Sequence, residues 1–149
     1  MPFIVWTSGM SVDVKLLDND HKKLAILIND LHDGVMTGCA RERLEHIFDE
    51  IVADSRTHFD HEERFLDKVG YSGAGAHKQE HGQKIQQVLV MQARFMTGAT
   101  FADDLEVLNQ LRDWLVNHIQ DSDQKFVAHL KAAGVDSILA KWNEQDGAA

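Results

Sequence analysis

The 149-residue chain has one cysteine, one proline and no long hydrophobic run. Cys39 has no second cysteine to pair with, which excludes an internal disulfide and makes the cytoplasm the expected location. No apolar stretch approaches the roughly 20 residues of a membrane-spanning helix, so no membrane span is expected. The first residues also lack the basic start of a secretion signal. Since the only proline is Pro2, long helices can run uninterrupted through the rest of the chain.

Positive charge is scarce as well. Lys and Arg number 15 against 24 Asp and Glu, which gives a formal net charge of −9 at pH 7. A nucleic-acid-binding surface needs a basic stripe, and this sequence contains none, so nucleic acid is not an expected partner. The length suits one domain spanning residues 1–149, which is large enough to bury a core of its own.

Apolar residues recur every three or four positions in four segments, which predicts helices near 14–37, 41–69, 76–96 and 103–131. The breaks between them are short, so consecutive helices should be antiparallel neighbours. The sequence therefore predicts an all-α, up-down-up-down four-helix bundle. The apolar stripes need no second copy to cover them, which favours a monomer.

Both ends of the chain extend beyond these four helices. Residues 1–12 are expected to form an extended N-terminal arm, which Trp6 could pack against the bundle. The pattern after Gly134 is compatible with a short fifth helix near 135–144.

Polar residues that can bind a metal ion interrupt all four apolar stripes. They are His21, His58, Glu62, His77, His81 and His118. Two pairs are spaced i, i+4, so each pair lies on one helix face. In an up-down-up-down bundle, the start of an odd helix lies beside the end of an even one, which brings all six residues into one layer. Without a metal, such a layer would be a set of poorly paired buried polar groups costing several kcal/mol.

The ligand types narrow the choice of metal. Five imidazoles exceed the need of one tetrahedral zinc ion, and the cysteines typical of structural zinc sites are absent. Imidazole with carboxylate suits iron, copper or nickel, and bridging carboxylates indicate a pair of ions. The Glu-x-x-His motif of ferritin-like di-iron enzymes does not occur here. A centre with more histidine and fewer carboxylates favours reversible dioxygen binding over oxygen cleavage.

Four segments in this order resemble the hemerythrin family, specifically its single-domain bacterial members. They are Leu17–Lys22, His58–Glu63, His77–His81, and Trp114–Ile119 followed by Asp123. The resemblance covers nearly the whole chain. It implies a non-haem centre of two iron ions (Fe²⁺/Fe³⁺), bridged by an oxo or hydroxo group and two carboxylates. The implied function is reversible dioxygen binding, for carriage, storage or delivery to an oxygen-using enzyme.

The resemblance also implies a role for each ligand. One iron would be held by His77, His81 and His118, the other by His21 and His58, with Glu62 and Asp123 bridging both. The iron with two histidines would keep an open position for dioxygen. Four residues match the family's apolar pocket lining: Phe59, Trp114, Leu115 and Ile119.

The second bridging carboxylate has two candidates. Asp123 comes five residues after His118, a rotation of roughly 140° on an ideal α-helix, whereas Asp121, three residues on, lies more naturally on the same face. The family pattern selects Asp123. This choice requires a local irregularity such as a π-type turn, or a reach across the seam.

Several alternatives stay open. The same centre could serve a di-iron peroxidase, a nitric-oxide-handling enzyme, an oxygen sensor or an iron buffer, so nitric oxide and peroxide are further candidate ligands. A carboxylate such as Asp18 could orient a ligating imidazole through its other nitrogen. Four histidines lie off the layer and are expected at the surface, with a supporting contact as the alternative for one of them, His61. They are His32, His46, His61 and His129.

Overall fold

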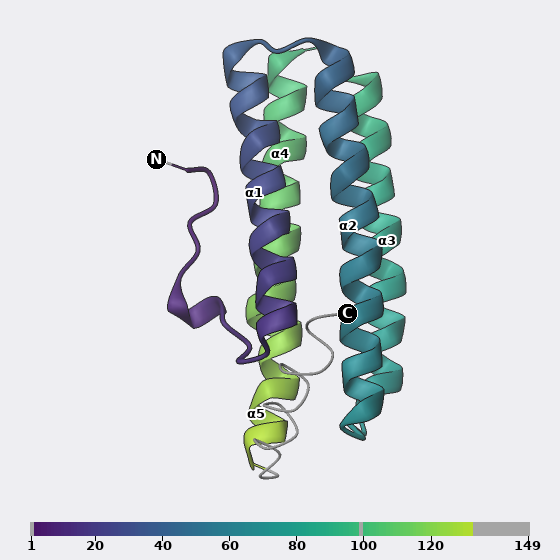
Figure 1. Cartoon of the computed structure of the whole chain (residues 1–149). Coiled ribbons are helices and arrows are strands. Elements are labelled where there is room, and N and C mark those ends of the chain that lie inside the picture. Colours follow the sequence, from purple (N-terminus) through teal and green to yellow (C-terminus); the bar gives the residue numbers. More distant parts are fainter. Residues whose placement is uncertain (1, 99, 133–149) are drawn as a thin grey trace.

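The computed structural model describes residues 2–98 and 100–132, and within these ranges the chain is helical without strands. Four long helices lie side by side (Figure 1). They are α1 (Lys15–Thr37), α2 (Arg41–Lys68), α3 (Ala74–Thr97) and α4 (Phe101–Asn117). Helices α1 and α3 each pack against both α2 and α4. This arrangement confirms the predicted up-down-up-down bundle, and the observed helix ends lie within a few residues of the predicted ones.

The stretch after α4 differs from the prediction of one continuous helix near 103–131. A π-helical segment, η2 (His118–Asp123), follows α4 directly, and the shorter helix α5 (Gln124–Ala132) continues from it. A π-turn accommodates an extra residue within a helix, and such turns frequently occur at functional sites. The predicted helix near 135–144 lies outside the described residues.

Buried apolar side chains form two separate clusters. The larger one follows most of the bundle and includes Phe48 and Leu111. The smaller one gathers around the beginning of α1, the end of α2 and α5. Its fully buried members are Val12, Val14, Leu17, Phe65, Leu66 and Phe126. The division matters because the predicted ligands lie between members of the two clusters along each helix.

The N-terminal arm runs beside α1, as Figure 1 shows. The backbone N–H of Ile4 donates to Asn29 Oδ1 (2.7 Å), and Asn29 Nδ2 donates to the Ile4 carbonyl (3.0 Å). Trp6 packs against the larger cluster, with Lys22 Nζ 5.3 Å from its ring centroid. The arm is therefore fastened along the outside of the bundle.

Asp18 also fastens the arm. Its carboxylate accepts hydrogen bonds from the Val12 N–H (2.8 Å) and the Ser11 hydroxyl (2.6 Å). The suggestion that Asp18 orients a ligating imidazole is therefore wrong. None of the helices formed by residues 2–98 and 100–132 combines the length and the apolar character needed to cross a membrane.

Candidate metal centre

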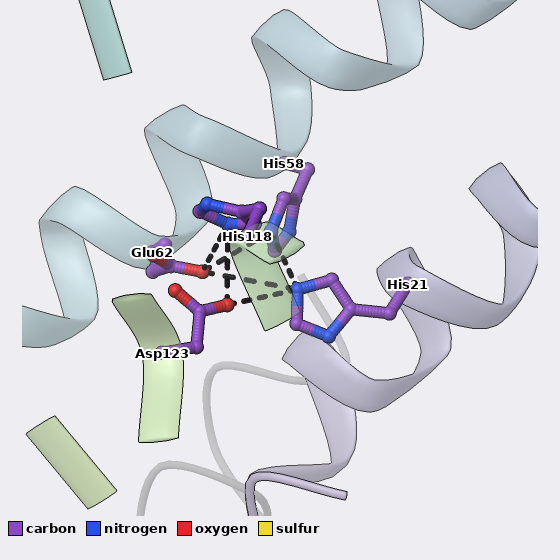
Figure 2. A group of neighbouring side chains, drawn as sticks. All are labelled: His21, His58, Glu62, His118 and Asp123. Carbon is purple, nitrogen blue, oxygen red and sulfur yellow. Dashed lines mark hydrogen bonds and ion pairs between the residues drawn. The ribbon is translucent and has the colours of Figure 1, made fainter. Parts of the chain in front are cut away.

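A layer of buried histidines and carboxylates crosses the bundle between the two apolar clusters. Figure 2 shows five of its side chains, which face one another. Its side chains come from α1, α2, α3 and η2. The members and their exposed fractions are His21 (0%), His58 (1%), Glu62 (0%), His77 (6%), His81 (2%), His118 (1%) and Asp123 (0%). These are the seven residues predicted as ligands, and the fold brings all of them together. They form two groups. Within each group, the candidate ligand atoms all lie within 4.8 Å of one another.

Glu62 belongs to both groups. Its Oε1 accepts hydrogen bonds from the Nε2 atoms of His77 and His81, the latter at 3.0 Å. Its Oε2 faces the other side of the layer, 3.1 Å from His58 Nε2 and 3.6 Å from His118 Nε2. A carboxylate that turns one oxygen to each group is placed to bridge two metal ions.

Asp123 divides its oxygens in a similar way. Its Oδ2 lies 3.0 Å from His21 Nε2 and 3.2 Å from His118 Nε2, while its Oδ1 lies 3.4 Å from His77 Nε2. The π-turn accounts for this placement, because residues five apart face the same side of a π-helix. Asp121, the alternative, is exposed. The irregular turn that Asp123 needs is thus present, and Asp121 is turned away from the layer.

The nitrogen and oxygen atoms of the layer would be better satisfied by metal ions than they are by one another. All five imidazoles direct Nε2 into the layer, where imidazole nitrogen and carboxylate oxygen suit iron. Several inward-facing atoms are buried and make no hydrogen bond, namely Glu62 Oε2, His118 Nε2 and both oxygens of Asp123. Buried polar atoms in this state are costly, and cations at the centre of the layer would satisfy them.

The five imidazoles divide unevenly between the groups. His77 and His81 share one group with Glu62, whereas His21, His58 and His118 fall into the other. The family resemblance assigns His118 to the iron of His77 and His81 instead. The His118 ring centroid lies 5.4 to 6.2 Å from the other four imidazole centroids. His118 is thus central, and the distances allow it to serve either ion.

Two of the ligating imidazoles contact a carboxylate through Nδ1, the ring nitrogen that is directed away from the layer. His58 Nδ1 lies 3.0 Å from Asp20 Oδ2, and His81 Nδ1 lies 3.1 Å from Glu63 Oε2. His61 Nδ1 approaches the same Asp20 oxygen at 2.8 Å. His61 is thus partly buried against the carboxylate that contacts a predicted ligand, which agrees with the alternative expected for it and not with a fully solvated surface position. Neither Asp20 nor Glu63 was predicted as a support, although each directly adjoins a predicted ligand in the sequence.

Apolar side chains pack against the ligands and form one wall of the site. Phe59 stacks on the His81 ring (4.2 Å between centroids, 10° between planes) and lies edge-on to His118 (5.1 Å). The four predicted pocket residues are buried in the larger cluster: Phe59, Trp114, Leu115 and Ile119.

Trp114 is held in this wall by a reciprocal pair of hydrogen bonds with α3. Its indole Nε1–H donates to the Lys84 carbonyl (3.0 Å), and Lys84 Nζ donates to the Trp114 carbonyl (2.9 Å). This pairing explains why a lysine lies near the apolar seam of α3.

The electrostatics of the metal-free layer follow from its two carboxylates. Burial alone would lower the pKa of His58, but the adjacent carboxylates of Asp20 and Glu62 outweigh it and raise the pKa to about 10. The same competition, with Asp123 and Glu62 as partners, raises the pKa of His77 to about 10 and that of His118 to about 9. Burial and the Glu62 charge would raise the pKa of Asp123, yet His118 and His21 lower it to about 2. Without metal, the layer therefore holds protons where the ions would bind.

These pKa directions predict how the stability of the metal-free chain depends on pH. Above pH 6.5, the unfolded chain releases the histidine protons that the folded layer still holds, so stability should fall as pH rises from 6.5 toward 9. Metal binding requires deprotonated imidazoles, and above pH 6.5 the histidines of the unfolded chain are deprotonated as well, so the stability of the metal-loaded chain should stay nearly constant over the same interval. Thermal unfolding with a chelator and with added Fe²⁺ under argon measures both trends. Parallel trends in the two forms would contradict this account.

Comparison with known proteins agrees with the geometry. Residues 12–130 match the family model of the hemerythrin HHE cation binding domain. Bacteriohemerythrin of Stenotrophomonas maltophilia is 30% identical over 132 residues, covering 89% of this chain and 84% of the relative. That of Methylococcus capsulatus is 32% identical, covering 89% of this chain and all of the relative. A crystal structure of wild-type hemerythrin superposes with a TM-score of 0.73 at 30% identity, over 85% of this chain and 96% of the other.

Proposed function

Because this chain belongs to the hemerythrin family, we propose that it binds dioxygen reversibly at a non-haem di-iron centre. The proposed ligands are the five histidines of the layer, with Glu62 and Asp123 as bridges. A bound iron pair would supply the chemistry of a two-electron exchange with dioxygen, one electron from each ion. The observation that carries the proposal is the division of both carboxylates between two groups of imidazoles in a buried layer.

The protein's own residues would hold the two ligand groups in place and exclude water from the site. Glu62 and Asp123 fix the spacing between the two groups, because each is anchored on its helix and faces both sides. Having fewer imidazoles, the proposed iron at His21 and His58 would keep a position for dioxygen. Phe59, Trp114 and their neighbours exclude water and protons from that space, which protects against irreversible oxidation. The indole of Trp114 keeps its place because its Nε1–H donates to the Lys84 carbonyl on α3, and Lys84 Nζ donates back to the Trp114 backbone carbonyl.

Reversibility is the decisive test of this proposal. Iron-loaded protein, reduced under argon and exposed to air, should gain the visible absorption of an oxo-bridged di-iron centre and lose it again under vacuum. Iron analysis should give two ions per chain. Absorption that persists under vacuum would contradict dioxygen carriage.

The proposed role is carriage, storage or delivery of dioxygen to an oxygen-using enzyme, by a monomer in the cytoplasm. Peroxide and nitric oxide are small enough for the same position. Sustained turnover of either one, well above that of free iron, would favour an enzyme instead. An oxygen-dependent protein partner would favour sensing.

A further inference from the structure

We propose that Asp20 and His61 form a positioning pair that holds His58 in its ligating orientation and strengthens the metal site of His21 and His58. The inference rests on the proposed function only for the identity of the metal, since the contacts themselves are properties of the chain. The Asp20–His61 pair lies outside the ligand layer, at its border with solvent. Their side chains are 17% and 21% exposed.

The contacts define the direction of each hydrogen bond. One oxygen, Asp20 Oδ2, lies 3.0 Å from His58 Nδ1 and 2.8 Å from His61 Nδ1. A carboxylate only accepts, so both imidazoles carry a proton on Nδ1. When a metal ion replaces the Nε2 proton of His58, the Nδ1 proton stays hydrogen-bonded to Asp20 and the lone pair of Nε2 is directed into the layer. Asp20 thus selects the ligating tautomer of His58.

His61 acts through Asp20. Residues 58 and 61 are three apart on α2, so their rings lie on one face and both reach the α1 carboxylate. The second hydrogen bond keeps Asp20 directed at His58, although this carboxylate could otherwise turn toward water. The pair also joins α1 to α2 immediately beside the ligand His21.

The support is selective among the ligands. Within the described residues, Nδ1 of His21 and Nδ1 of His118 are buried without a hydrogen bond. His58 is therefore the carboxylate-backed imidazole of the site proposed to hold only two histidines. A carboxylate behind a ligating imidazole makes the nitrogen a stronger donor. The metal held by His58 should be bound more tightly, and its ferric state should be favoured by the nearby negative charge.

Metal titration of the full-length, metal-free protein tests this inference without reference to dioxygen. We expect Asp20→Ala to weaken the weaker of two Co²⁺ sites by about 10- to 100-fold, the usual cost of losing such a support. Asp20→Asn should have a smaller effect, because its amide oxygen still accepts from His58 while the charge is lost. In the iron-loaded form, both variants should shift the reduction potential to more positive values, which loosened packing alone would not explain. Asp60→Ala is the matched control, since Asp60 is an exposed α2 carboxylate paired with Arg64.

A double-mutant cycle tests whether His61 acts through Asp20. His61→Ala alone should weaken Co²⁺ binding less than Asp20→Ala, and it should add nothing once Asp20 is alanine. Additive effects, an unchanged weaker site, or an equal effect of Asp60→Ala would each overturn the inference. Asp20→Asn keeps the test open if Asp20→Ala does not fold. Failure of reversible dioxygen binding in the unmodified protein would overturn the proposed function but leave these metal affinities as an independent result.

Discussion

Replacing Glu62 with alanine is expected to abolish the paired metal site. The number of iron ions bound per chain should fall from two to at most one, and the affinity for the remaining ion should drop by more than about 100-fold, since losing a direct ligand exceeds the loss of a support. The reason is that, within residues 2–98 and 100–132, Glu62 alone belongs to both candidate ligand groups. Iron analysis after anaerobic loading and gel filtration measures the change.

Two further variants separate charge from packing. Glu62→Gln keeps the size of the side chain but removes the charge, and it should also fail to hold two ions. Glu50→Ala removes an exposed carboxylate from the same helix and should change affinity by no more than about twofold. If Glu62→Ala still bound two ions, the bridging role of this residue would be wrong.

The second large effect is expected at Asp123. Asp123→Asn should weaken binding of the ion pair by at least about 10-fold, because this side chain is fully buried and reaches imidazoles of both groups. Isothermal titration with Fe²⁺ under argon measures the affinity. The visible spectrum of the oxidised protein should lose its oxo-bridged bands in the same variant.

Asp121 provides a matched control two residues away. It is exposed, so Asp121→Asn should leave metal affinity within about twofold of the original value. The reverse outcome, with Asp121 sensitive and Asp123 tolerant, would mean that the π-turn does not persist in the metal-loaded protein. The pair of variants thus tests the unusual turn as well as the ligand.

Much of the fold follows from the spacing of apolar residues. The stripes on α1 and α2 predict those helices almost to the residue, because a buried helix face repeats every three to four positions. The convergence of the histidines follows from antiparallel packing of consecutive helices. Periodicity could not select Asp123, because a regular helix directs it away from His118. The π-turn is a departure from regular geometry, and family resemblance rather than local pattern indicated it.

The carboxylates that contact the ligating imidazoles from outside the layer were harder to predict. Asp20 lies off the apolar stripe of α1, and its contact with His58 depends on the rotation of α1 against α2, which no single-helix pattern specifies. Asp18 was an equally reasonable candidate by sequence, but it binds the arm instead. The sequence feature that could have indicated this contact was the spacing of His61, three residues after His58, which places both rings on one face of α2.

The separation of the core into two apolar clusters has a consequence for cooperativity. At the level where the clusters meet, cohesion depends on ligand contacts instead of continuous hydrophobic packing. A pair of ions held jointly by α1, α2, α3 and η2 would have to lose its ligands before either end could open alone. Loading with metal would then merge two locally unfolding units into one, and removing it would let the end that carries α5 fluctuate independently of the remainder.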